Sequence, residues 1–273
     1  MVIKEAETEL FESIESLVQK ISLEPVDSDV AVIILKIHNP SLQTTEKSYN
    51  LKIMGKRIID WLKLAFGSCP TLEIETDMKA DILSTIKPVL TEKKWTAVFY
   101  ADTPLLERKT FLNILDYAIV KQTKVLKLER GYVFNTEYLK TCEHLISEFE
   151  EHKFSTDNFL SVFNMTELEK ANQILKNRII LFHQQNGVQI LDKNSCFIDF
   201  DVKIGKDVII YPSTTICGNT TIDDNVCLGP NVTIVSSLIH KNNNLKNCYI
   251  ENSEIKEKTT LKPFSSVING VKK

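Results

Sequence analysis

The feature that most constrains this fold is an aliphatic residue that recurs every six positions in the C-terminal third of the chain. A small or β-branched residue precedes it by two positions each time. The aliphatic set is Ile198, Ile204, Ile210, Ile216, Ile222, Leu228 and Ile234, and the preceding set is Cys196, Val202, Val208, Thr214, Thr220, Val226 and Val232. Neither a helix nor a single strand, with periods of about 3.6 and 2.0 residues, maintains such a spacing.

This repeat predicts a left-handed parallel β-helix over about residues 196–267. Three short strands close a triangular coil, the aliphatic residue points inside, and successive coils stack in parallel. The spacing is lost after Val235 and returns at Ile255, Leu261 and Val267, so we expect about four coils with a corner loop or irregular coil near residues 236–247. A short column has an open terminal coil that association would cover, which favours a homo-oligomer, and a trimer in particular.

Before the repeat, β-branched runs alternate with amphipathic segments. We expect strands at residues 30–37, 71–75, 95–100 and within 125–134, and helices at residues 8–21, 55–66, 77–90 and 109–120. This order predicts an open α/β sheet whose ligand crevice lies at the carboxyl ends of its strands. The helix at 8–21 is expected to pack on its own domain or to form an oligomer contact.

A long helix is expected at residues 166–185, with Thr166 and Glu169 as its capping pair and Gly187 at its end. The chain should therefore consist of an α/β domain over residues 1–165, a connecting helix over 166–187 and a β-helix over 188–273.

Composition excludes several classes of protein. The chain has 33 basic and 36 acidic residues and a net charge of −3, without a basic block, so nucleic acid is not an expected partner. It lacks both a run of about 20 apolar residues and the layout of a secretion signal, so we expect no membrane span and a cytoplasmic location. Six cysteines without CxxC spacing are expected to be buried small residues.

Several segments together resemble GlmU, the bacterial family that joins a UDP-N-acetylglucosamine pyrophosphorylase domain to a glucosamine-1-phosphate N-acetyltransferase β-helix. The resemblance spans most of the chain from Val30 onward and is most specific from Phe159 to Thr221. The segments that carry it are ADTPLL, GYVF, FLSVFNMTELEKANQIL, NGVQILD and FIDFDVKIGKDVIIYPSTTICGNTTI. It implies a reduced nucleotidyltransferase-like, Rossmann-like sheet followed by the β-helix.

The resemblance also implies a Mg²⁺ site. Asp102 matches the metal-binding aspartate of the family, and Asn164 is similar in context to the second ligand. Oxygen ligands of this kind suit a cation that bridges phosphates. Each residue has a structural alternative, because Asp102 could cap a turn or the next helix and Asn164 could cap the long helix.

The sequence departs from the family pattern in two places. KIHNPSLQTTEKSYN replaces the glycine-rich loop after the first strand, so the backbone cradle for a triphosphate is not expected, and Lys47, Lys52 or Lys56 would have to supply the phosphate contacts. Lys56 could equally be a solvent-facing helix start. LKPFSSV resembles the rung just before the acetyl-transfer site, so the family's catalytic histidine would lie farther on, and His240 is not its expected replacement.

Three functions remain open at this point. The first is an inactive or weakly active relative that serves as a binding or assembly module for a nucleotide or sugar phosphate. The second is an active Mg²⁺-dependent nucleotidyltransferase that makes a UDP-sugar from UTP and a sugar 1-phosphate. The third is a hexapeptide acyltransferase with a site between subunits, for which the sequence shows no suitable general base.

Overall fold

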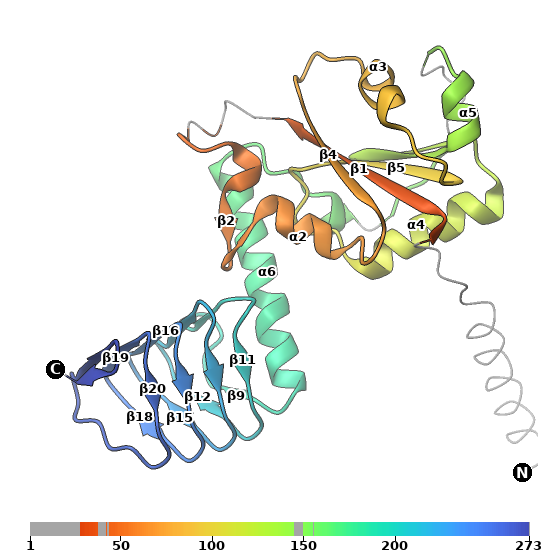
Figure 1. Cartoon of the computed structure of the whole chain (residues 1–273). Coiled ribbons are helices and arrows are strands. Elements are labelled where there is room, and N and C mark those ends of the chain that lie inside the picture. Colours follow the sequence, from red (N-terminus) through yellow and green to blue (C-terminus); the bar gives the residue numbers. More distant parts are fainter. Residues whose placement is uncertain (1–27, 38–41, 43, 145–149, 155, 273) are drawn as a thin grey trace, which may run out of the picture. The chain divides into compact units, whose positions relative to one another are not determined.

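A computed structural model describes residues 28–37, 42, 44–144, 150–154 and 156–272 (Figure 1). The helix expected at residues 8–21 lies outside the described residues. The chain divides into two compact units. The sheet unit comprises Met1–Ile37, Leu62–Ala101 and Leu106–Phe159, and the coil unit comprises His38–Trp61, Asp102–Leu105 and Leu160–Lys273.

The sheet unit contains a six-stranded mixed sheet in the order β4-β1-β5-β7-β6-β8. Its strands are β1 (Val30–Ile37), β4 (Thr71–Thr76), β5 (Trp95–Tyr100), β6 (Val125–Leu128), β7 (Gly131–Asn135) and β8 (Glu150–Glu151). β1 is parallel to β4 and β5, whereas β7 is antiparallel to both β5 and β6. The open α/β sheet is confirmed, but the strand expected within residues 125–134 is a pair of strands joined by a tight turn.

Helices cover both faces of this sheet. α3 (Ile82–Ile86) and α5 (Thr136–Thr141) pack on one face, where Leu83 and Leu139 join a cluster with Leu35 and Val98. α4 (Arg108–Lys121) packs on the other face, where the centroids of the Phe111 and Phe66 rings lie 5.1 Å apart. The helix expected at 77–90 is reduced to α3 and the 3₁₀ turn η4 (Lys87–Val89), because the cap at Asp81 starts it late and a proline follows.

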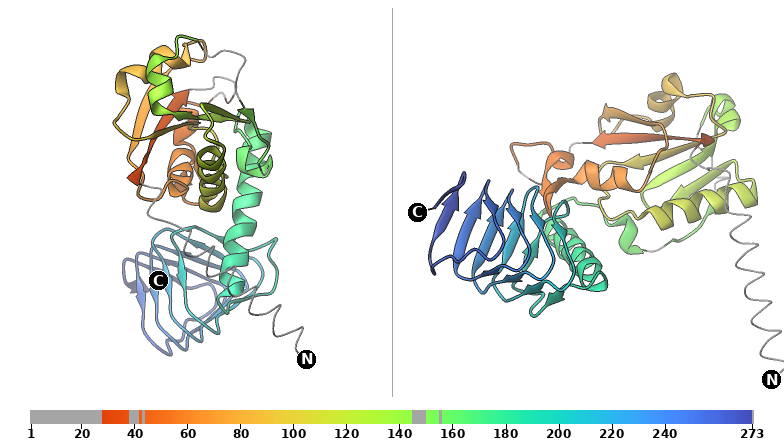
Figure 2. Two further views of the ribbon diagram at one scale, coloured as in Figure 1. Left: turned by 90° about the vertical axis from the view of Figure 1, so that its right-hand side faces the viewer. Right: turned by 60° about the horizontal axis from the view of Figure 1, so that its bottom comes forward.

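The coil unit is a parallel β-helix built from three sheets, in the orders β10-β13-β16-β19-β21-β22, β11-β14-β17-β20 and β18-β15-β12-β9. Figure 2 shows these coils in two further views. The strands are β9 (Gln189–Ile190), β10 (Phe197–Ile198), β11 (Lys203–Ile204), β12 (Ile209–Ile210), β13 (Thr215–Cys217), β14 (Thr221–Ile222), β15 (Cys227–Leu228), β16 (Val232–Val235), β17 (Leu238–Ile239), β18 (Asn244–Leu245), β19 (Cys248–Glu251), β20 (Glu254–Ile255), β21 (Ser266–Ile268) and β22 (Val271–Lys272). Both predicted residue sets are buried, except that Ile204 is only partly buried.

The segment expected to form a corner loop or an irregular coil, residues 236–247, instead continues the β-helix. Ile222 pairs with Ile239 rather than with the residue one position later, and Ile234 pairs with Ile250. The offset between coils is 18 residues from Ile216 to Ile234, 17 from Ile222 to Ile239 and 16 from Ile234 to Ile250, because corners have lost residues. Ser236 turns such a corner with φ +45°. The six-residue pattern fails in the sequence while the inner column remains continuous.

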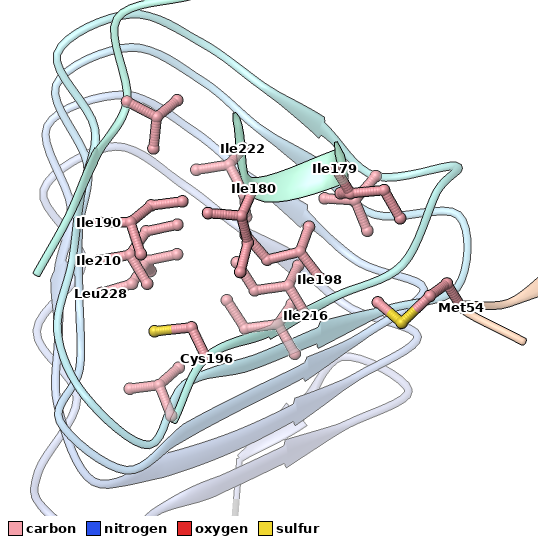
Figure 3. Packing of buried hydrophobic residues seen from close by; sticks show 14 of the residues in the cluster. Met54, Ile179, Ile180, Ile190, Cys196, Ile198, Ile210, Ile216, Ile222 and Leu228 are labelled. Carbon is pink, nitrogen blue, oxygen red and sulfur yellow. The ribbon is translucent and has the colours of Figure 1, made fainter. Parts of the chain in front are cut away.

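The long helix α6 (Met165–Gln185) packs on β9 and β10 of the first coil. A hairpin of β2 (Lys52–Ile53) and β3 (Lys56–Arg57) packs at the corner after β10, where the Phe200 N–H donates to the Met54 carbonyl at 3.2 Å. Ile179 and Ile180 of the helix join the buried column, and Figure 3 shows both beside Ile198 and Ile216 within the triangular coils. Met54, at the hairpin tip, is buried in the same cluster. The helix expected at 55–66 is therefore only α2 (Ile58–Leu64), because its first residues belong to the hairpin.

The start of α6 differs from the predicted capping pair of Thr166 and Glu169. Asn164 is the N-cap, and its side-chain oxygen accepts a hydrogen bond of 3.0 Å from the Glu167 backbone N–H. The Glu167 carboxylate in turn accepts one from the Phe163 N–H at 2.6 Å. The pair was misplaced by two residues because Asn-x-x-Glu and Thr-x-x-Glu overlap here, and asparagine is a strong N-cap.

Candidate functional site

The strand order of the sheet unit marks one edge as the natural place for a ligand. The chain leaves β1 for β4 on one side and then crosses to β5 on the other, so the order reverses between β1 and β5. Ligands of open α/β sheets bind at the carboxyl ends of the strands at such a reversal. The two strands remain joined just beyond this point, where the Ala101 N–H donates to the Leu35 carbonyl at 3.0 Å.

Asp102, the first candidate magnesium ligand, follows β5 directly and is 8% exposed. Its backbone carbonyl accepts a 2.9 Å hydrogen bond from the Val162 N–H. Arg178 of α6 donates to the Leu105 carbonyl at 2.9 Å, which fixes the other end of the same short segment. The structure therefore brings the chain around Asp102 beside the chain that leads into Asn164.

Asn164, the second candidate ligand, is used differently. Its amide oxygen, the atom that would bind a cation, accepts the helix-capping hydrogen bond. Among the described residues, no group of three or more His, Cys, Asp or Glu side chains is placed to hold a metal ion. An amide oxygen has a second lone pair, so the cap competes with a contact to Mg²⁺ without excluding it, and the magnesium site stays a prediction.

Two of the candidate phosphate-binding lysines, Lys52 and Lys56, lie on the β2–β3 hairpin. Lys56 forms an ion pair of 3.0 Å with Asp201 and lies over the Phe200 ring, with its Nζ 4.8 Å from the ring centroid. Lys52 is exposed, as is Lys47 before the hairpin. Lys56 thus anchors the hairpin to the β-helix, and its predicted phosphate contact stays a prediction.

The hairpin tip also faces a carboxyl group. Asp199 accepts a 3.0 Å hydrogen bond from the Gly218 N–H, and a side chain at Gly55 would lie 2.9 Å from its Cγ. Burial raises the pKa of Asp199, the Gly218 hydrogen bond opposes this rise, and nearby Asp201 adds to it. These contacts belong to the packing of the coil unit.

His240 has both ring nitrogens engaged by carboxylates. Its Nδ1 lies 3.1 Å from Asp223 on the preceding coil, and its Nε2 lies 2.8 Å from Glu254 on the following one. Hydrogen bonds to Glu254 and then Asp223 raise the pKa of His240. A general base needs a nitrogen directed at its substrate, so this arrangement favours a structural role.

Burial raises the pKa of four cysteine thiols, those of Cys196, Cys217, Cys227 and Cys248. None of the six cysteines, all of which are among the described residues, forms a disulfide, and burial raises the pKa of Cys248 to about 11. A thiol with a raised pKa is a poor nucleophile and a poor metal ligand at neutral pH.

In the described part of the chain, no helix has the length and apolar character needed to cross a membrane.

Comparison with known proteins shows which proteins this chain resembles. The family model "Bacterial transferase hexapeptide (six repeats)" matches residues 201–236. The bifunctional protein GlmU of Clostridium kluyveri is 39% identical over 108 residues, that of Clostridium beijerinckii 38% over 123, and that of Clostridium botulinum 35% over 146. These matches cover 40%, 45% and 51% of this chain.

Over about half of its length, the chain is similar to GlmU. It spans between 24% and 30% of the length of these GlmU proteins. A solved structure, Rv0371c from Mycobacterium tuberculosis, is similar over 53% of this chain and 97% of its own, with a TM-score of 0.39 and 11% identity. A likeness at that level says nothing about function.

One residue that the comparison with the GlmU pattern did not select lies at the carboxyl edge of the sheet. Arg130, in the turn between β6 and β7, has its guanidinium carbon 3.9 Å from the centroid of the Tyr100 ring. Sequence reasoning treated this region as one strand, so the turn and its arginine were not placed at the edge. The signal was present in the pair Glu129 and Arg130, which interrupts two apolar strands.

Proposed function

We propose that this GlmU relative is a binding module for a nucleotide or nucleotide-sugar and does not catalyse nucleotidyl transfer at an appreciable rate. One observation carries the proposal: the amide oxygen of Asn164 is engaged as the N-cap of α6. One of the two matched oxygen donors is thus already engaged in the helix cap, which leaves it less available to an ion that would bridge the phosphates.

The position of Lys56 supports the same proposal. It is paired with Asp201 and packed on Phe200 within the coil unit, so it is a poor substitute for a lysine that contacts phosphate in a catalytic loop. The sheet nevertheless retains the strand order that creates a ligand site between β1 and β5. Binding is therefore better supported than turnover.

Incubation with UTP, N-acetylglucosamine 1-phosphate and Mg²⁺, followed by a pyrophosphate assay, tests the absence of catalysis. We expect no turnover above background, together with a thermal shift induced by UTP or UDP-N-acetylglucosamine. Turnover that Asp102→Ala abolishes would establish the active nucleotidyltransferase instead. Absence of any thermal shift and of binding by calorimetry would remove the binding module.

The acyltransferase alternative is less supported, because both nitrogens of His240 are engaged by carboxylates. An assay with acetyl-coenzyme A and glucosamine 1-phosphate checks it, and we expect no free thiol to be released. We also propose that the protein forms a homo-trimer, which sedimentation equilibrium at several concentrations tests. The cytoplasmic location stays a prediction.

A further inference from the structure

The helix α4 carries an open groove of about 460 Å³, which we call the α4 groove. Its lining comes from one stripe of the helix, with neighbours three or four residues apart, and from the short segment after β8. It includes Asn113, Asp116, Tyr117 and Val120 on the helix and His152 and Phe154 in the segment. The buried side of α4, with Phe111 and Leu115, is a different stripe, so the groove belongs to the side of the helix away from the sheet.

Aromatic and aliphatic side chains make up much of the α4 groove. The His152 ring stacks on the Tyr117 ring with centroids 4.3 Å apart, and the Phe154 ring meets His152 edge-on at 4.7 Å. Val120 is 79% exposed and its neighbour Ile119 is 38% exposed. The described residues therefore leave a continuous apolar surface in water along the last turns of α4, and such a surface gains stability when another element covers it.

The sequence supplies an element that needs such a surface. Residues 8–21, which lie outside the described residues, have apolar positions at helical spacing. These positions are Leu10, Phe11, Ile14, Leu17, Val18 and Ile21. A lone helix of about this length is marginal in water, so its stripe requires a partner. A second helix laid along the stripe of α4 would place two rows of the same spacing against each other, as in ordinary helix packing.

The segment is tethered within reach of the α4 groove. The chain enters the sheet at Val30, which pairs with Trp95 of β5, and Trp95 pairs with Asn135 of β7. The Asn135 N–H donates to the Lys124 carbonyl at 3.0 Å, and α4 ends just before Lys124, at Lys121. Entry point and helix end are thus three strand spacings apart, about 14 Å across the sheet. Residues 22–27 can span up to about 20 Å.

From this placement we infer that residues 8–21 of the same chain cover the α4 groove, with their apolar stripe packed against Tyr117, Val120 and Phe154. Charge agrees with this occupant. Residues 1–27 contain seven acidic residues and two lysines, and Lys121 lies in the lining of the groove. The inference is independent of the proposed nucleotide binding, because it concerns a different surface of the sheet unit.

Hydrogen–deuterium exchange of the full chain, read by mass spectrometry, tests the inference. In the wild type, amides of residues 8–21 should exchange at least about tenfold more slowly than those of an unstructured chain. Val120→Asp places a carboxylate in the apolar contact and should remove most of this protection, an effect of about tenfold or more. Leu17→Asp should do the same from the other side of the contact.

Met78→Asp is the matched control. Met78 is 64% exposed and follows β4, at the opposite end of the strand order from β8. The variant also replaces an exposed apolar side chain by aspartate and makes the same change in net charge, and it should leave the exchange of residues 8–21 as in the wild type. Circular dichroism and thermal unfolding of all variants check that they are folded.

A cross-linking experiment identifies the chain that supplies the segment. In the double variant Val18→Cys and Val120→Cys, a short bismaleimide should join the two cysteines within one chain, as mass spectrometry and electrophoresis can show. A cross-linked dimer would assign the groove to a second copy and overturn the inference. Unprotected residues 8–21 in the wild type, or protection that Val120→Asp leaves intact, would overturn it as well.

Discussion

The two units reach a defined structure by different routes. In the coil unit, a residue meets its equivalent one coil away, as Ile198 meets Ile216 and Ile216 meets Ile234, so one packing rule is repeated along the column. In the sheet unit, neighbours come from distant parts of the chain, as when Leu35 pairs with Tyr100. The first unit depends on repetition and the second on a particular set of pairings.

The two units also differ in the neighbours that they give to a charged side chain. In the coil unit, a charged side chain can meet charged residues of the coils on either side, as His240 is held by carboxylates from both adjacent coils. In the sheet unit, one antiparallel strand interrupts a parallel series and leaves unusual neighbours at an edge. Arg130 lies in the turn between β6 and β7, with its guanidinium over the Tyr100 ring of β5.

The largest effect should come from breaking the repeated packing. Ile210 is fully buried inside the β-helix, so Ile210→Ala should lower the free energy of unfolding by about 2–5 kcal/mol through lost burial and a cavity. Its neighbour Ile209 is only partly buried, and Ile209→Ala should cost clearly less. Urea denaturation of both variants measures the difference, and equal losses would contradict an inward and outward alternation.

A smaller effect should come from the close strand approach in the sheet unit. Gly131→Ala places a Cβ against the Val98 carbonyl at a positive φ, and should cost about 2–3 kcal/mol. Gly187→Ala is the control, because its φ is +92° but no atom lies within 4 Å of the added Cβ. It should cost about 1 kcal/mol, the penalty for the backbone conformation alone. Similar losses, measured by thermal unfolding, would show that the strands separate easily.

The cap of α6 should contribute less again. Asn164→Ala removes the hydrogen bond to the Glu167 N–H and should lower stability by about 1 kcal/mol. Asn164→Asp keeps an oxygen at the same place and should retain most of the stability. The urea midpoints of the three proteins measure this order. A neutral Asn164→Ala would argue that the side chain is reserved for another purpose, including a metal ion.

The smallest effect should be a dependence on pH within the coil unit. Because the folded-state pKa of His240 is raised, the charged form contributes stability that is fully present below its ordinary pKa of about 6.5 and is lost as pH rises through the folded value. The wild type should therefore exceed His240→Gln in urea midpoint most at pH 5 to 6 and least near pH 9. A difference that grows with pH would show that the carboxylates do not stabilise the charged ring.

The sequence predicted the regular part of the coil unit more fully than it predicted the sheet unit. The buried column from Ile198 to Ile234 was predicted residue by residue because each coil repeats one local pattern. The shortened coils after Val235 were missed, since losing a corner residue destroys a spacing without disturbing the contacts inside. The turn before Gly131 was missed because strand direction depends on partners far away in the chain.

The candidate site residues were subject to a further limit. Asn164 was correctly given helix capping as its alternative, whereas Lys56 was assigned to a phosphate or to solvent and in fact pairs with Asp201, many residues later in the chain. A spacing rule reveals near neighbours such as Glu167. It cannot reveal a partner that only the folded coil brings close.

The cover on the first coil has a consequence for growth into fibres. A regular parallel column offers unpaired backbone groups at each end, and a second copy can add its own strands there and repeat the process. At the end that begins with β9 and β10, α6 lies against the column with Ile180 in its buried cluster, and the β2–β3 hairpin packs at the corner after β10, where the Phe200 N–H donates to the Met54 carbonyl at 3.2 Å. A helix pairs its own backbone groups and cannot extend a ladder of strands, so we expect α6 to hinder the addition of another copy at that end.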